Sequence, residues 1–151
     1  MKKRKLDDRE QIESILEKAL VCRLGMADEN RPYVVPMNFG YRDGVIYCHT
    51  GPGGKKMDIL RRNPLVCFEV DTDHAFIRGE QACQWSMKFR SVVGYGRAEL
   101  AETDAEKRAG LDVLMAHYSD RSYDYPDEKL AITAVIRIVI DRMHGMSCGY
   151  E

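Results

Sequence analysis

The sequence contains no apolar run long enough to cross a membrane and no excess of charge of either sign. Crossing a bilayer takes about 20 consecutive apolar residues, and charged residues follow the basic residues 1–5 where a secretory signal needs an apolar segment. The 23 Lys and Arg and the 24 Asp and Glu give a formal charge of −1, whereas a general nucleic-acid binder carries a net basic surface. We therefore expect a cytoplasmic protein whose partners include neither a membrane nor a nucleic acid.

Motifs of metal, disulfide and hydrolase chemistry are also absent. The five cysteines are odd in number and no two have CxxC spacing, which argues against a disulfide framework and a zinc knuckle. The four histidines lack HxxxH and HExxH spacing, and no GxSxG nucleophile elbow occurs. We expect no metal site and no Ser–His–Asp hydrolase, and the odd cysteine count is compatible with a reducing compartment.

Length and composition describe an ordinary globular chain. Of the 151 residues, 44% are hydrophobic and 31% are charged, and a disordered chain would be poorer in apolar residues. A chain of this size buries roughly two-thirds of its unfolded surface and needs no disulfides to fold. We therefore expect residues 1–151 to form a single domain.

Three segments carry the sequence signals of a helix. Residues 12–19 place apolar side chains at i, i+3, i+4 and i+7. A second helix is expected over residues 55–62, directly before an Asn-Pro pair that disfavours helical backbone. Thr103 and Glu106 form a capping box that begins the third helix.

Alternating apolar residues and turn residues predict six strands, most of which follow one another without an intervening helix. Asp43-Gly44 is a hairpin signal, while residues 72–87 and 119–127 are expected to be irregular loops. This order excludes a βαβ Rossmann layout. It favours a mainly β fold, a closed or nearly closed antiparallel barrel with peripheral helices. The strands are expected at residues 21–26, 33–39, 45–49, 65–71, 90–100 and 132–140.

Residues 47–56 combine a strand end, a glycine-rich break and two lysines. His49 and Thr50 end the strand, and Lys55 and Lys56 begin the next helix. Backbone N–H groups at a helix N-terminus favour an anion, and lysine adds formal charge. The segment therefore predicts a phosphate site, although a turn with solvated lysines gives the same pattern and neither a Walker A motif nor GxGxxG is present.

A second segment, residues 85–96, holds the only Trp, two basic residues, and two glycines at strand positions. Glycines within a strand indicate a bulge or the close approach of something flat. Aromatic, basic and glycine residues together suit a flat anionic ligand that contains a ring. An exposed strand with ordinary core aromatics is the alternative interpretation.

These two segments carry a resemblance to a known family. From its first helix to its last strand, the sequence resembles the pyridoxamine 5′-phosphate oxidase-related FMN-binding split-barrel family, and within it the 5-nitroimidazole resistance (Nim-type) group. The pyridoxal-phosphate-binding signature of the true oxidase is not evident, so vitamin B6 oxidation is not expected. The matching segments are residues 31–39, 47–50, 55–56, 89–96, 138–142 and 145.

The resemblance implies a six-stranded antiparallel split barrel that forms a homodimer with FMN at the subunit interface. One copy of the chain would supply the ring wall and the phosphate contacts, and Trp85, Arg90 and Ser91 would approach the flavin, from the second subunit. From ring to phosphate, the cofactor-binding residues implied for one copy are Val35, Pro36, Met37, Asn38, His49, Thr50, Lys55 and Lys56.

The function that this resemblance implies is an FMN-dependent oxidoreductase that reduces a small organic acceptor, such as a nitroaromatic or nitroimidazole compound. His49 is the expected catalytic residue, because an imidazole can donate a proton to the reduced acceptor near neutral pH. Two alternatives stay open: a flavin-binding module without turnover, and a split barrel that binds haem or another flat tetrapyrrole. Neither the electron donor nor the acceptor is indicated by a motif.

Overall fold

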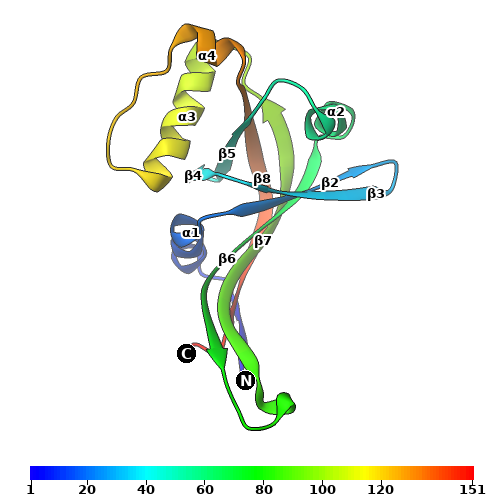
Figure 1. The fold of residues 1–151 in the computed structure, drawn as a ribbon, viewed down its shortest axis with the longest axis vertical. Helices are drawn as coiled ribbons and strands as arrows, with labels where there is room; N and C mark the ends of the chain where they lie inside the picture. The colour runs from blue at the N-terminus through cyan, green and yellow to red at the C-terminus, as the bar shows by residue number, and fades with distance from the viewer.

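Eight antiparallel strands form one sheet that curls round without closing (Figure 1). The computed structural model describes residues 1–151. Along the sheet the strand order is β3-β2-β6-β7-β8-β5-β4, and β1 pairs with β8. The expected mainly β, antiparallel fold is therefore confirmed. The strands are β1 (Lys3–Leu6), β2 (Cys22–Asp28), β3 (Arg31–Met37), β4 (Gly40–Arg42), β5 (Val45–Thr50), β6 (Leu65–Ile77), β7 (Ser86–Leu100) and β8 (Ala134–Cys148).

Helices lie at the periphery of the sheet, and side chains cap the starts of two of them. The Asp8 side chain accepts a hydrogen bond from the Gln11 N–H at the start of the first helix, and Thr103 and Glu106 form the expected capping box. None of the helices is both long enough and apolar enough to cross a membrane. The helices are α1 (Arg9–Lys18), α2 (Lys55–Arg62), α3 (Asp104–Tyr118), α4 (Asp127–Ala131) and the 3₁₀ turn η1 (Ala82–Gln84).

One face of the curled sheet forms the core. Leu24, Phe68 and Val92 from β2, β6 and β7 are fully buried there, and α1 adds Leu16. Gly94 of β7 lies opposite Phe68, and a Cβ at Gly94 would overlap the Phe68 ring. The flat group that this strand glycine accommodates is therefore a core phenylalanine.

The segment 72–87, expected to be an irregular loop, is instead a paired hairpin. β6 continues to Ile77, β7 begins at Ser86, and η1 closes the tip. We call residues 73–88 the arm; it extends away from the rest of the sheet at the lower end of Figure 1. The loop prediction was wrong because the ladder shifts register between Thr72 and Ala75. Beyond the shift the arm covers no core, so the apolar alternation that marks a strand is lost.

The strand count also differs, eight instead of six, for local reasons. β1 is mostly charged, and only its Leu6 is buried. The strand predicted over residues 33–39 ends at Met37, and the chain then enters the separate strand β4. The last strand runs on to Cys148, past a register shift that leaves Asp141 without a partner, and a bulge of this kind interrupts the sequence pattern. The short helix α4 lies between the expected polar loop and the expected start of that strand, which begins at Ala134 and not at residue 132.

Candidate functional site

The two edges of the sheet meet at Asn38 and Phe39. β3 is one edge strand and β4 is the other, and only these two residues separate them in the chain. β4 pairs with β5 only as far as Tyr47, so residues 48–50 have no strand partner on that side. We call the opening between the free edge of β3 and the free edge of residues 48–50 the split. Backbone N–H and C=O groups along these edges are available to a ligand.

Helix α2 follows β5 after residues 51–54 and is fixed against the β2–β3 hairpin. The Arg62 guanidinium donates two hydrogen bonds to the Asp28 carboxylate, with N···O distances of 3.2 and 2.7 Å. The Asn63 side chain donates to the Ala27 carbonyl at 3.0 Å. The Lys55 Nζ lies 4.4 Å from the centre of the Tyr33 ring. These contacts hold the N-terminus of α2 beside β3 and at the end of β5.

The N-terminus of α2 has the properties of an anion site. Its N-cap is Gly54, with φ of 100°, and no side chain accepts a hydrogen bond from the first turn. Nothing lies within 4 Å of a Cβ built on Gly51, Gly53 or Gly54, so the loop faces open space. A helix N-terminus without a side-chain cap leaves N–H donors free for an anion. The residues present therefore fit the phosphate end of a flavin nucleotide.

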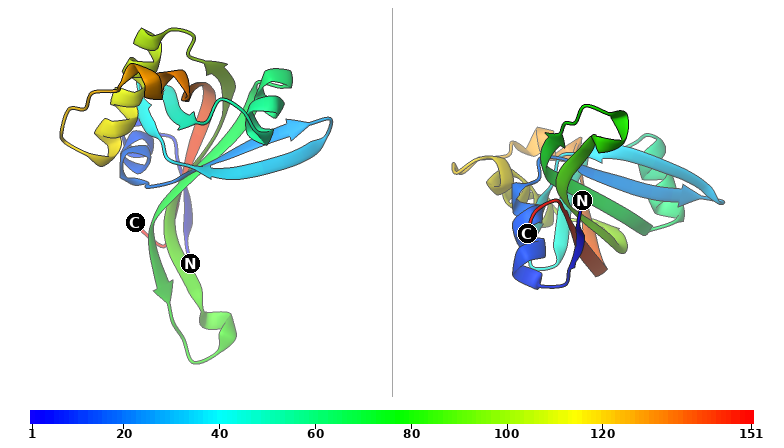
Figure 2. Two further views of the ribbon diagram at one scale, coloured as in Figure 1. Left: turned by 45° about the horizontal axis from the view of Figure 1, so that its top comes forward. Right: turned by 90° about the horizontal axis from the view of Figure 1, so that it is seen from below.

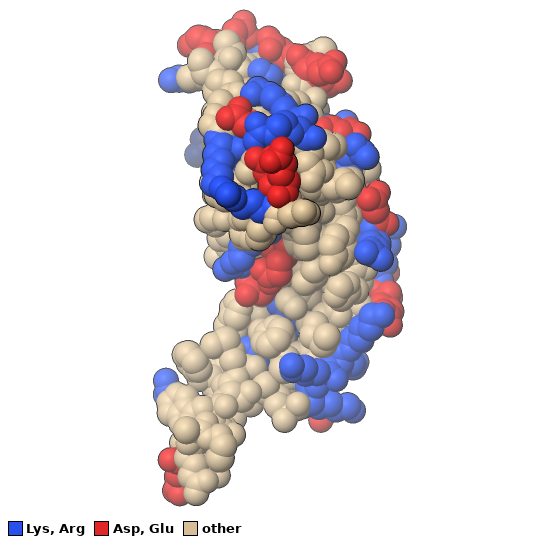
Figure 3. Space-filling view, turned by 90° about the vertical axis from the view of Figure 1, so that its right-hand side faces the viewer, with Lys and Arg blue, Asp and Glu red and all other residues tan.

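The two lysines predicted to hold that phosphate have different surroundings. Lys55 lies over Tyr33 of β3. Lys56 is half-buried, and its charge is felt by Cys48 of β5: burial raises the pKa of that thiol to about 12, while Lys56 acts in the opposite direction. One lysine therefore lies against β3, and the charge of the other acts on β5. Figure 3 shows Lys and Arg gathered on the surface around α2.

The residues predicted to line the flavin ring differ in how far their side chains are exposed. Asn38 and His49 are exposed at the two sides of the split, and Thr50 is half-buried. Pro36 is exposed on the face of β3 away from the core. Met37 is only 6% exposed and belongs to the core, so a ligand in the split can meet its backbone but not its side chain.

Val35 and Tyr33 complete the β3 side of the split. Val35 is half-buried and packs against the core. Tyr33 was not among the predicted site residues, although strand alternation places it on the same face as Val35. That periodicity, combined with the lysine at the start of α2, is the signal that could have identified it.

Trp85, Arg90 and Ser91 do not join the other predicted site residues within one chain. Trp85 lies at the tip of the arm and is 50% exposed, and Arg90 and Ser91 lie at the arm's base in β7. Figure 2 shows the arm and α2 at opposite ends of the molecule. Residues of the arm could therefore contact a flavin in the split only if they came from a second copy.

The sheet face away from the core exposes apolar side chains from several strands. Val34 of β3 is 64% exposed, Leu65 of β6 is 56% exposed and Tyr95 of β7 is 42% exposed. Ser91 lies on this face, opposite Asp71 of β6. Apolar side chains exposed together across a sheet are typical of a surface that another protein covers.

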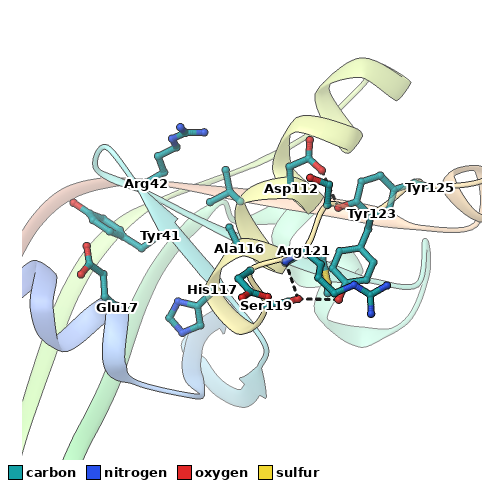
Figure 4. A pocket seen from close by; sticks show the side chains of 14 residues that line it. Glu17, Tyr41, Arg42, Asp112, Ala116, His117, Ser119, Arg121, Tyr123 and Tyr125 are labelled. Atoms are coloured by element: carbon teal, nitrogen blue, oxygen red, sulfur yellow. Dashed lines mark hydrogen bonds between the residues drawn. The ribbon is translucent and has the colours of Figure 1, made fainter.

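A cavity of about 870 Å³ lies elsewhere, between α1, β4, α3 and the loop that follows α3 (Figure 4). It contains none of the residues predicted for the flavin. The Tyr125 hydroxyl donates to the Asp112 carboxylate across its wall at 3.0 Å, and burial together with Asp112 raises the pKa of Tyr125 to about 12. His117 and Tyr41 line the opposite side.

Comparisons with known proteins agree with this fold. The sequence profile of the family described as Pyridoxamine 5′-phosphate oxidase matches residues 8–147. An uncharacterized protein of Rhizobium meliloti (strain 1021) is 29% identical over 62 residues, which are 41% of this chain. The match spans only 40% of that relative's length.

Three solved structures superpose on nearly the whole chain. A Bacteroides thetaiotaomicron protein, provisionally described as a 5-nitroimidazole antibiotic resistance protein, is 38% identical, with a TM-score of 0.86 over 96% of this chain and 87% of that one. A Mesorhizobium loti FAD-binding protein is 26% identical, with a TM-score of 0.72 over 99% and 100% of the two chains. An FAD- and haem-binding protein of Mycobacterium smegmatis, 18% identical, shares the fold with a TM-score of 0.86 over 97% and 74%.

These matches confirm the resemblance seen in the sequence, including the likeness to the 5-nitroimidazole resistance group and to the split-barrel fold. The profile begins one residue before α1 and ends one residue before the end of β8. The chain belongs to the pyridoxamine 5′-phosphate oxidase family.

Proposed function

We propose that the protein binds FMN in the split and acts as an oxidoreductase that reduces a small organic acceptor, such as a nitroaromatic compound. The observation that carries this proposal is the coincidence of free strand edges with the uncapped N-terminus of α2 and its two lysines. The bound flavin would supply the electrons, and the protein would position it and the acceptor. The names of the Mesorhizobium loti and Mycobacterium smegmatis proteins, both FAD-binding, support a flavin.

Each part of the split has a task in this proposal. Lys55, Lys56 and the first N–H groups of α2 would hold the phosphate. The backbone N–H of Asn38, which directly follows β3, would donate to the ring edge where negative charge develops on reduction, which is the role of preorganised donors in many enzymes. His49 would lie beside the ring at the end of β5 and donate a proton to the acceptor.

The functional unit in this proposal is a homodimer with a flavin at the subunit interface. The exposed apolar face around Val34, Leu65 and Tyr95 would be covered by the second copy. Ser91 on that face, and Trp85 at the tip of the arm, would then complete the partner's flavin site. We also propose the cytoplasm as its location, where the five thiols would remain reduced.

Spectroscopy of the purified protein tests the proposal. We expect flavin absorbance bands, release of FMN on denaturation, and quenching of the fluorescence of added FMN by the apoprotein. FAD in place of FMN would revise the cofactor, whereas a Soret band would support the haem alternative. No binding of any flavin would refute the proposal.

Turnover and assembly need separate measurements. We expect oxidation of NADH or NADPH, or of a chemical reductant, coupled to reduction of a nitroaromatic acceptor. Flavin binding without any such turnover would favour the module that only stores or senses flavin. Light scattering should give twice the 17.3 kDa chain mass, and a monomer that binds FMN at full occupancy would contradict the interfacial site.

A further inference from the structure

Four side chains converge where the arm leaves the barrel. The Asp73 carboxylate accepts a hydrogen bond from Arg90 Nη1 at 2.5 Å and another from Lys18 at the end of α1. The Tyr150 hydroxyl donates to the Asp73 carbonyl at 2.6 Å. The Arg90 guanidinium also stacks on the Tyr150 ring, with 4.2 Å from Cζ to the ring centre. Asp73 thus ties α1, β7 and the C-terminal residues to one point.

That point is the origin of the arm. Asp73 has φ of 59°, and the β6–β7 ladder shifts register between Thr72 and Ala75. Asp is among the few residues that adopt this left-handed conformation at low cost. The Asp73 side chain is only 14% exposed. Its partner Arg90 is 34% exposed, so this ion pair is screened less by water than a pair of two fully exposed side chains.

The alternation of β7 separates the two residues that the sequence motif places together. Val92 is fully buried in the core, and Arg90, two residues earlier, lies on the same face. Ser91 lies on the opposite face, across from Asp71. A second copy that covers the outer face could be reached by Ser91, whereas the Arg90 side chain is directed to Asp73 and Tyr150.

We propose that Arg90 is a positioning residue that fixes the arm through Asp73, Lys18 and Tyr150, and is not a flavin ligand. This inference rests on the proposed function, in which the arm of one copy completes the flavin site of its partner. The cluster sets the direction of the arm, and through it the position of Trp85 at the tip. We call these four residues the arm lock.

Asp73→Asn distinguishes the two roles because they predict opposite signs. If Arg90 bound the flavin directly, removing the carboxylate would free its guanidinium and tighten FMN binding. If Arg90 acts through Asp73, the same change loosens the arm and weakens FMN binding. Asn tolerates the left-handed backbone and keeps the side-chain size.

The experiment measures FMN affinity of the full-length protein by flavin fluorescence. We expect Asp73→Asn and Arg90→Gln each to weaken FMN binding by at least about threefold. The affinity of the double variant should lie within about twofold of that of the weaker-binding single variant, as expected for partners in one interaction. Arg90→Lys should recover part of the affinity, because it keeps the charge near Asp73. Asp127→Asn, which breaks the exposed pair between Asp127 of α4 and Arg108 of α3, is the matched control and should leave FMN affinity unchanged.

A second measurement does not depend on flavin. Hydrogen exchange of the apoprotein should show faster exchange of arm amides, residues 76–88, in Asp73→Asn and in Tyr150→Phe, with the barrel strands unchanged. If the wild-type protein bound no flavin, the proposed function would fail while the exchange data still decided whether the lock exists. Tighter FMN binding by Asp73→Asn, or unchanged arm exchange in both variants, would overturn the inference.

Discussion

The phosphate of FMN gives a direct test of the α2 site, because riboflavin carries the same ring without the phosphate. Lys56→Gln removes one positive charge at the N-terminus of α2 and keeps a polar side chain of similar length. Lys56 is half-buried, so its attraction for an anion is screened less than that of a fully exposed lysine. We expect the variant to bind FMN more weakly and riboflavin as well as the wild type.

The magnitude follows from the kind of contact that is lost. A hydrogen bond to a charged group contributes about 1.5–3 kcal/mol, which corresponds to a loss of about 10- to 150-fold in affinity. The remaining Lys55 and the backbone N–H groups of α2 also contact the phosphate in our proposal, so the lower end of that range applies. Raising the salt concentration should shrink the FMN difference between variant and wild type.

Fluorescence titration gives the affinity of each protein for FMN and for riboflavin. The effect is the change, between wild type and variant, in the ratio of these two affinities. Lys129→Gln on the remote helix α4 is the matched control and should leave both affinities unchanged. Equal weakening of FMN and riboflavin by Lys56→Gln would mean that the lysine supports the fold of the loop and not the phosphate. In that case the assignment of α2 as the phosphate site would be refuted.

Three further predictions concern the reaction and the fold. His49→Ala should retain flavin, while the rate of acceptor reduction should fall by about 10²- to 10⁴-fold, the usual contribution of general acid catalysis. Equal single-turnover rates for the variant and the wild type would exclude that role. Gly94→Ala should collide with the Phe68 ring and destabilise the protein by about 1–3 kcal/mol, seen as a lower urea midpoint at unchanged m value; an unchanged midpoint would contradict the packing. Hydrogen bonds from Lys18, and then from Arg90, hold the pKa of Asp73 below its usual range. The stability that this carboxylate contributes is therefore present above its unfolded pKa of about 3.9 and is lost as the pH falls through the lower folded value. Asp73→Asn should therefore lower the free energy of unfolding at neutral pH, and that free energy should fall less steeply with acidification than in the wild type. Equal slopes for the two proteins would refute this reasoning.

Much of the barrel could be predicted because its strands have one buried face. The alternation of β8, with Ile136 and Ile138 buried, and the capping box of α3 at Thr103 are signals that the local sequence carries in full. The arm could not be found in this way, because neither of its faces meets a core. Phe76 of the arm, for example, is 65% exposed and does not belong to a row of buried apolar residues.

The loop that we propose to hold the phosphate was predicted from local signals alone. Gly54 and Lys55 mark the start of α2 in the sequence, and the structure leaves that start uncapped. What the local pattern could not give is the partner on β3, since the contact between Lys55 and Tyr33 joins residues 22 positions apart in the chain. It depends on how the sheet curls.

The pair Arg90-Ser91 shows why a motif alone cannot assign a ligand within a β-sheet. Adjacent residues of a strand point to opposite faces, so a motif that contains both necessarily places one of them toward the core side. The buried Val92 determines which: Arg90 shares its face and meets Asp73, while Ser91 faces outward. A second copy bound to the outer face is presented with the hydroxyl and not with the guanidinium. In our proposal, Arg90 therefore affects a flavin only indirectly, by holding the arm in position.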